Sequence, residues 1–151
     1  LAPKGFHAQY SAKKKIYRYA IWNQPHRPLM NRRTVHFVPT PLDLKAMKKG
    51  AQAFKGKHDF KAFHSSGREV ASTVRTVFSL HVRASGGTIL IDVQANGFLY
   101  HMVRRMTGLL IEIGKGKLPP AAVKTALSGR SKIIPPTAPA KGLTLMSVQY
   151  G

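Results

Sequence analysis

VRTVFSLHVRASGGTILIDVQA, residues 74–95, is the stretch that decides the fold class. Apolar and polar residues alternate along both halves, as in strands that bury one face. Gly86 and Gly87 suit the turn between them, because glycine readily adopts the positive φ angles of two-residue hairpins. The alternation points one set of residues inward (Val74, Thr76, Phe78, Leu80, Val82, Ile89, Ile91, Val93) and another outward (Arg75, Ser79, His81, Arg83, Asp92, Gln94). The stretch therefore predicts an antiparallel hairpin.

Two more strands are predicted, one before this hairpin in the sequence and one after it. Residues 13–22, KKKIYRYAIW, have the same two-residue period and are rich in aromatic residues. One face of this strand carries Lys15, Tyr17, Tyr19 and Ile21, and the other carries Ile16, Arg18, Ala20 and Trp22. A basic loop follows at 24–33, with two prolines and three arginines. The last strand is predicted over 143–150, LTLMSVQY, after a proline-rich loop at 135–139.

Three segments predict helices. The first begins at Thr40 and Pro41, with Thr40 as N-cap, and ends at Gly56. Its apolar residues recur at helical spacing: Leu44, Met47, Ala51 and Phe54. Residues 98–113, FLYHMVRRMTGLLIEI, are apolar on most sides and predict a largely buried helix, and a short helix is predicted over 121–127. The fold class is therefore α+β: an antiparallel sheet with helices packed on one face, forming a single domain over 1–151.

The charge of the chain indicates its class of partner. Its 151 residues include 25 Lys and Arg but only 5 Asp and Glu, a net charge of +20, while 43% of residues are hydrophobic. A folded domain this basic attracts polyanions, of which nucleic acid is the commonest. The alternative explanation for the excess of basic residues is a general solubility bias. An anionic membrane fits less well, because it would favour a basic amphipathic helix with a bulky apolar face, whereas the basic residues here lie mainly on predicted strands and loops. No apolar run approaches the roughly 18 residues of a membrane span.

The sequence contains no self-evident catalytic motif. With no cysteine, disulfides and thiolate metal sites are excluded, and the seven histidines show no metal-binding spacing, so no metal site is predicted. The GKGK stretch at 114–117 lacks the spacing of a phosphate-binding loop. The five carboxylates are best explained by structural roles, because no two of them are spaced as an acid–base pair.

Two features suggest more than structure. Tyr17 and Tyr19 share a strand face beside a run of lysines, which suits a platform on which a base stacks while cations hold phosphates. Two core tyrosines are the alternative. Arg104 lies inside the apolar helix, where an unpaired guanidinium is costly. Its partner could be a carboxylate outside this chain, or the side chain could extend to the surface instead.

Several motifs together carry a resemblance to one family. They are FHAQYSAKKKIYRY (6–19), GKHDFKAF (56–63), VRTV (74–77), NGFLYHMVRRMTG (96–108) and TAPAKGLTL (137–145). In this order they resemble the C-terminal half of the catalytic domain in the tRNA pseudouridine synthase A family. The resemblance implies an isomerase without cofactor that detaches a uracil in the anticodon arm of tRNA, turns it over and rejoins it through C5. Base flipping of this kind costs a few kcal/mol.

The resemblance also implies roles for individual residues. Tyr17 would stack on the base, and Arg104 would pair with the catalytic aspartate and keep it charged. Substrate contacts are expected for Tyr19, His101 and Leu143. A surface that binds tRNA is expected at Lys13, Lys14, Lys15, Arg18 and Arg75.

The departures from the family pattern lead to further expectations. The family's catalytic Asp lies in a GRTDxG motif that this sequence lacks, Tyr100 stands where His is frequent, and Gln9 where Arg is usual. We therefore expect a truncated chain that is inactive alone, from an enzyme that is homodimeric and cytoplasmic, although an organelle is not excluded. A non-catalytic RNA-binding or ribosome-associated protein on the same fold is the alternative, and a degraded pseudoenzyme is a third possibility.

Overall fold

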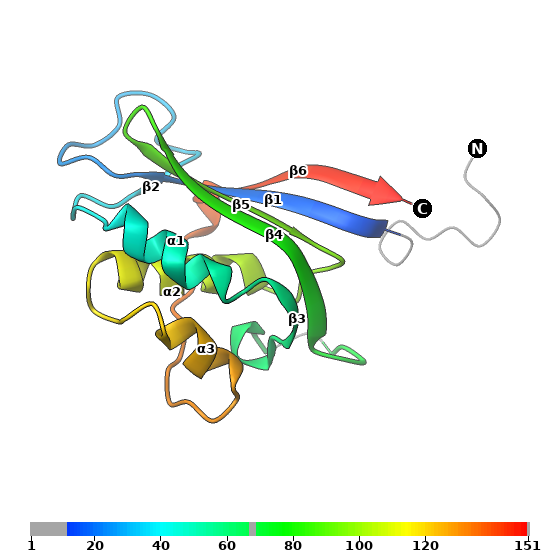
Figure 1. Cartoon of the computed structure of the whole chain (residues 1–151). Coiled ribbons are helices and arrows are strands. Elements are labelled where there is room, and N and C mark those ends of the chain that lie inside the picture. The colour runs from blue at the N-terminus through cyan, green and yellow to red at the C-terminus, as the bar shows by residue number, and fades with distance from the viewer. Residues whose placement is uncertain (1–11, 67–68, 151) are drawn as a thin grey trace, which may run out of the picture.

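The computed structural model describes residues 12–66 and 69–150, which form a sheet with helices on one of its faces (Figure 1). The strands are β1 (Ala12–Trp22), β2 (His36–Phe37), β3 (Gly56–Asp59), β4 (Val74–Ser85), β5 (Thr88–Ala95) and β6 (Leu143–Tyr150). Their order is β2-β1-β5-β4-β3, and β6 pairs with β1. The helices are α1 (Leu44–Gln52), α2 (Met102–Gly114) and α3 (Ala122–Leu127), with short 3₁₀ turns at Lys61–Phe63 and Ala140–Gly142. The α+β prediction is confirmed.

The sheet is antiparallel as predicted, with one exception. β1 pairs antiparallel with both β5 and β6, whereas the two-residue β2 pairs with the end of β1 in parallel. Neither β2 nor β3 was predicted, because each is too short to show a clear period. The motif 6–19 is described only from residue 12 onward, so its first part and Gln9 lie outside the described residues.

The hairpin of β4 and β5 forms as predicted, but the faces of the first half of β4 are reversed. Gly86 and Gly87 form the turn with φ angles of +54° and +82°. The pairing with β5 shifts register between Val77 and Ser79, which marks a β-bulge. Val77 is therefore 1% exposed and Phe78 45% exposed. The inward prediction for Val74 and Phe78 was wrong, because a bulge inverts the alternation of every residue before it.

Both long helices begin later than the sequence pattern predicts. Asp43, not Thr40, caps α1, since its carboxylate accepts a hydrogen bond from the Ala46 amide at 3.1 Å. α2 starts at Met102 rather than at residue 98, because His101 has a φ of +63° and breaks the helical path. Residues 98–101 therefore lie outside the helix and belong to the turn that connects the end of β5 to α2.

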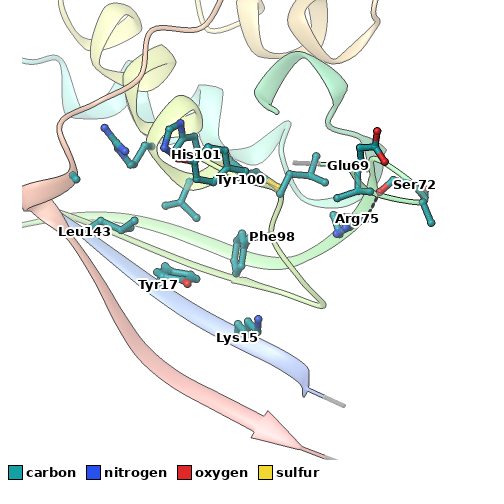
Figure 2. Close-up of a pocket in the computed structure, with 16 residues that line it drawn as sticks. Lys15, Tyr17, Glu69, Ser72, Arg75, Phe98, Tyr100, His101 and Leu143 are labelled. Atoms are coloured by element: carbon teal, nitrogen blue, oxygen red, sulfur yellow. Dashed lines mark hydrogen bonds between the residues drawn. The ribbon is translucent and has the colours of Figure 1, made fainter. Parts of the chain in front are cut away.

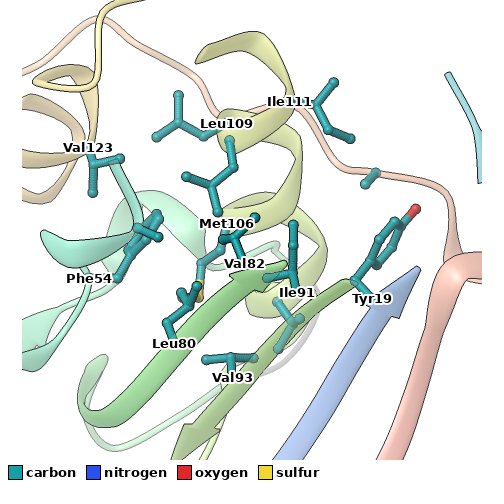
Figure 3. Close-up of a cluster of buried hydrophobic side chains, with 14 of the residues drawn as sticks. Tyr19, Phe54, Leu80, Val82, Ile91, Val93, Met106, Leu109, Ile111 and Val123 are labelled. Carbon is teal, nitrogen blue, oxygen red and sulfur yellow. The ribbon is translucent and has the colours of Figure 1, made fainter. Parts of the chain in front are cut away.

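The core lies between the sheet and the helices (Figure 3). The sheet contributes Leu80, Ile91 and Val93, which pack against fully buried residues of α2 such as Met106 and Leu109. A cluster of Phe54, Phe60 and Phe63 fills the space beside them. In the described part of the chain no helix is both long and apolar enough to cross a membrane.

Candidate active site

A cavity of about 810 Å³ opens at one end of the sheet face that the helices cover (Figure 2). It lies between β1, the start of β4, the turn at 98–101, the first turn of α2 and the start of β6. The lining residues are Lys15, Tyr17, Glu69, Val70, Ala71, Ser72, Arg75, Phe98, Leu99, Tyr100, His101, Met102, Val103, Arg104, Ala140 and Leu143. Sequence elements far apart in the chain thus meet around one space.

Tyr17 and Phe98 give the cavity an aromatic wall. Tyr17 is partly buried on β1, between Val93 of β5 and Leu145 of β6, and its ring meets Phe98 edge to face at 5.1 Å. Figure 2 shows the two rings side by side along the sheet. An aromatic ring that is held by such a contact and is open on one side can stack on a planar base.

Tyr19 does not join this wall, although it shares the face of Tyr17. It is 0% exposed, and its hydroxyl donates a hydrogen bond to the Pro139 carbonyl at 2.6 Å. Burial raises the pKa of this hydroxyl. The expected contact between Tyr19 and the substrate is therefore wrong: residues 139–142 cover the ring, and it serves the core.

Arg104 reaches the cavity from the first turn of α2. Its Nε donates to the Ala138 carbonyl at 2.7 Å, which fixes one edge of the guanidinium. Across residues 12–66 and 69–150, no ion pair joins it to a carboxylate; Glu112 instead lies 4.0 Å from Lys115 and 3.9 Å from Lys117. Among the described residues the structure gives no partner to the two terminal nitrogens of Arg104, so these can bind a carboxylate or a phosphate in two-pronged fashion.

His101 and Leu143 also line the cavity, as expected from their motifs. The positive φ of His101 turns the chain into α2, and the Nδ1 of its ring lies 3.0 Å from the Ser65 hydroxyl. Its ring stacks on that of Tyr100 with centroids 3.8 Å apart. Leu143 opens β6, where it lies opposite Tyr19 in the register with β1 and offers an apolar contact.

Arg75 and Glu69 are cavity residues that sequence reasoning missed in this role. The β-bulge turns Arg75 from the predicted outer face to the inner one, and partial burial lowers the pKa of its guanidinium. A bulge leaves no clear sequence signal, so the alternation alone could not find this. Glu69 is the one carboxylate among the lining residues; Figure 2 places it with Ser72 and Arg75, at the end away from Leu143.

The remaining cations predicted to bind RNA do not form one surface. Lys15 lines the cavity, whereas Lys13 and Lys14 are exposed, and the Lys14 ammonium lies 5.4 Å from the Phe78 ring centroid. Arg18 projects from the other side of the sheet, where both oxygens of Asp92 accept from it at 2.7 and 3.0 Å. Its charge is already paired, and this ion pair raises its pKa.

The cavity thus combines flat aromatic and apolar walls with three cations, Lys15, Arg75 and Arg104. This combination suits a planar ring attached to an anionic backbone, which is the chemistry of a nucleotide. No group of three potential metal ligands occurs within the ranges that the structure describes. The arrangement can hold a base and can orient an acid that is brought to Arg104.

Comparison with known proteins identifies what the chain resembles. A family model described as tRNA pseudouridine synthase matches residues 51–151. Relatives named tRNA pseudouridine synthase A occur in Syntrophotalea carbinolica (47% identical over 155 residues, 99% of this chain and 60% of the relative) and Ruminiclostridium cellulolyticum (43% over 151 residues, 98% and 61%). Another occurs in Moorella thermoacetica (44% over 146 residues, 96% and 59%). The chain thus spans about 60% of the length of these relatives.

Proposed function

The chain belongs to the tRNA pseudouridine synthase family, and from this premise we propose that it forms part of an enzyme that converts uridine to pseudouridine in the anticodon arm of tRNA. Residues 1–151 would act as one domain, the C-terminal subdomain of the catalytic unit. The family resemblance implies that no cofactor takes part, and the isomerisation balances within the substrate. The bond from N1 of uracil to C1′ breaks, the bond from C5 to C1′ forms, C5 loses its proton and N1 gains one.

The observation that carries the proposal is that Tyr17 and Arg104 line the same cavity. Tyr17 would stack on the flipped uracil and retain it while it is detached from the ribose, with Leu143 as an apolar contact. His101 would line the same pocket. The terminal nitrogens of Arg104 would hold a catalytic carboxylate, since a two-pronged guanidinium both orients a carboxylate and favours its charged form.

That carboxylate would come from a part of the enzyme outside these 151 residues. The GRTDxG motif does not occur in the sequence. Glu69 lines the cavity but forms no ion pair with Arg104 in the described part of the chain, and it lies at the end away from Leu143 (Figure 2). We therefore infer that the chain alone is inactive.

A chimera tests this proposal. The chain would replace the matching 60% of the Syntrophotalea carbinolica relative, and tritium release from tRNA labelled at C5 of uridine would be measured. The chimera is expected to release tritium, whereas the chain alone stays at background. Arg104→Lys in the chimera should lower turnover at least tenfold despite the retained charge, because an ammonium cannot bind a carboxylate in two-pronged fashion.

Arg83→Lys, on exposed β-strand surface, is the matched control and should leave turnover unchanged. Turnover by the chain alone would contradict the missing carboxylate, and wild-type turnover of the Arg104→Lys chimera would contradict the pairing role. An inactive chimera that still binds tRNA would instead favour the non-catalytic RNA-binding protein, an alternative that the charge of +20 supports.

We also propose, from the family resemblance, that the complete enzyme is a homodimer and that it acts on tRNA in the cytoplasm. Sedimentation of the chimera would report its oligomeric state directly. A monomer that retains turnover would show that dimerisation is dispensable for the reaction.

A further inference from the structure

Arg75 stands out among the cavity residues because its position depends on an irregularity of the sheet. The register pairs Val77 with Ala95 of β5, and Ala95 with Lys15 of β1. Without the bulge between Val77 and Ser79, Arg75 would point to the outer face. With it, Arg75 lies on the cavity side of β4, two strands away from Tyr17 (Figure 2).

The guanidinium of Arg75 is held in place but not saturated. Its Nη1 donates to the carbonyls of Ser72 at 2.8 Å and of Val74 at 2.7 Å, which uses both hydrogens of that nitrogen. Among the described residues the structure gives no acceptor for Nε or Nη2. These two nitrogens form one edge of the planar group, the edge that binds a phosphate or carboxylate through two parallel hydrogen bonds.

Within residues 12–66 and 69–150, no ion pair neutralises Arg75. Glu69 lines the same end of the cavity, yet no ion pair joins the two side chains in the part of the chain that the structure describes. Lys15 faces the cavity from β1 and adds a second cation. A partly buried guanidinium with an open edge and no counterion favours an anionic ligand.

We propose that Arg75, supported by Lys15, forms a phosphate-binding subsite for the RNA backbone that leads away from the base held by Tyr17. This inference rests on the proposed function, since it names a second contact of the same site. Two strand spacings of about 4.8 Å separate β1 from β4. Along the strands, Arg75 lies two residues beyond Val77, which is in register with Lys15, so it is about four residues, or ~13 Å, from the level of Tyr17. The guanidinium is therefore placed for a backbone phosphate farther along the RNA than the one that flanks the flipped base.

The subsite can be tested with RNA in which single phosphates are made neutral. The probe is a short hairpin RNA with uridines in its loop, prepared with one methylphosphonate linkage at a time. Binding to the chain is measured for wild type, Arg75→Ala and Arg75→Gln, with Arg83→Ala as a control on the exposed part of the same strand. Circular dichroism reports whether each variant is folded; Arg75→Gln keeps an amide donor for the carbonyls if Arg75→Ala unfolds.

One linkage is expected to weaken wild-type binding roughly tenfold when neutralised, the usual size of one charge-assisted contact. Arg75→Ala and Arg75→Gln should bind the unmodified hairpin about tenfold more weakly and should be insensitive to that linkage, whereas Arg83→Ala should behave like wild type. A variant at Arg75 that remains as sensitive as wild type to every linkage overturns the subsite but leaves the proposed function intact. Failure of the wild-type chain to bind any hairpin would also overturn the subsite, whereas the proposed function stands or falls separately with tritium release by the chimera.

Discussion

The two ends of one sheet face differ in what covers them, and Tyr17 and Tyr19 show the difference most directly. They lie two residues apart on β1 with their side chains on the same face. Tyr19 is sealed under residues 139–142, its hydroxyl bonded to Pro139, whereas Tyr17 is partly open and lines the cavity. The same residue type in the same strand thus serves the core at the closed end and the site at the open end.

At the closed end, the backbone of residues 136–142 passes very close to the Tyr19 ring and to helix α2. A Cβ on Gly142 would lie 2.7 Å from the Tyr19 ring, and one on Gly108 of α2 would lie 1.9 Å from the Pro136 carbonyl oxygen. At the open end no such contact restricts Gly97, whose Cβ would lie 3.5 Å from Arg75. Gly108 of the NGFLYHMVRRMTG motif and Gly142 of the TAPAKGLTL motif therefore close the core, while aromatic and cationic residues of the same motifs form the cavity.

Replacing the two tyrosines gives the largest expected effect. Tyr19→Ala should lower the free energy of unfolding by about 3–5 kcal/mol, because it empties a fully buried aromatic site. Tyr17→Ala should cost far less stability but weaken binding of uridine-containing RNA by about 1–3 kcal/mol, while Tyr17→Phe keeps the stacking. Urea unfolding and fluorescence titration measure the two quantities. Equal stability losses at both positions would contradict the division into a closed and an open end.

The next largest effect on stability is expected from glycine-to-alanine substitutions, one at the closed end and one at the open end. Gly108→Ala should destabilise the fold by about 3 kcal/mol, because the clash is with a carbonyl oxygen of the backbone rather than with a movable side chain. Gly97→Ala meets only ordinary contacts and should change the free energy of unfolding by less than about 0.5 kcal/mol. A Gly108→Ala protein as stable as wild type would show that residues 136–138 do not pack on α2 as the structure has them.

The smallest expected effect concerns the protonation of His36, which lies at the closed end. Burial, together with the charges of Lys141 and Lys115, lowers the pKa of His36, whose ring contacts Tyr19 edge to face. The unfolded chain then binds a proton more readily than the folded one, so this residue makes stability fall as the pH drops below about 6.5, the ordinary value for histidine. Melting temperatures at pH 7.5 and 5.5 should differ less for His36→Gln than for wild type, whereas the exposed His81→Gln should not alter the difference. An unchanged pH dependence in His36→Gln would contradict the lowered pKa.

The sequence was informative wherever a regular period met a distinctive residue. The period of β1 separates its two faces correctly, so the prediction that Tyr17 and Lys15 share a face is confirmed by their places in the cavity wall. The apolar run of α2 singled out Arg104, and the two glycines fixed the hairpin turn. The sequence pattern failed where one local irregularity decides direction: the bulge moved Arg75 into the cavity, and the positive φ of His101 delayed the start of α2.

Composition and periodicity by themselves determined that this chain is a basic α+β protein with an aromatic strand and an arginine in an apolar helix, because burial of alternating or helical apolar faces is a local property of the sequence. Only the tertiary structure decided which tyrosine meets solvent, which arginines face the cavity and which are paired. Those outcomes depend on the path of residues 136–142 over α2 and β1 and on the pairing of β4 with β5. Contacts between segments that are distant in the chain produce no periodic pattern in the sequence of either segment, so they cannot be predicted from it.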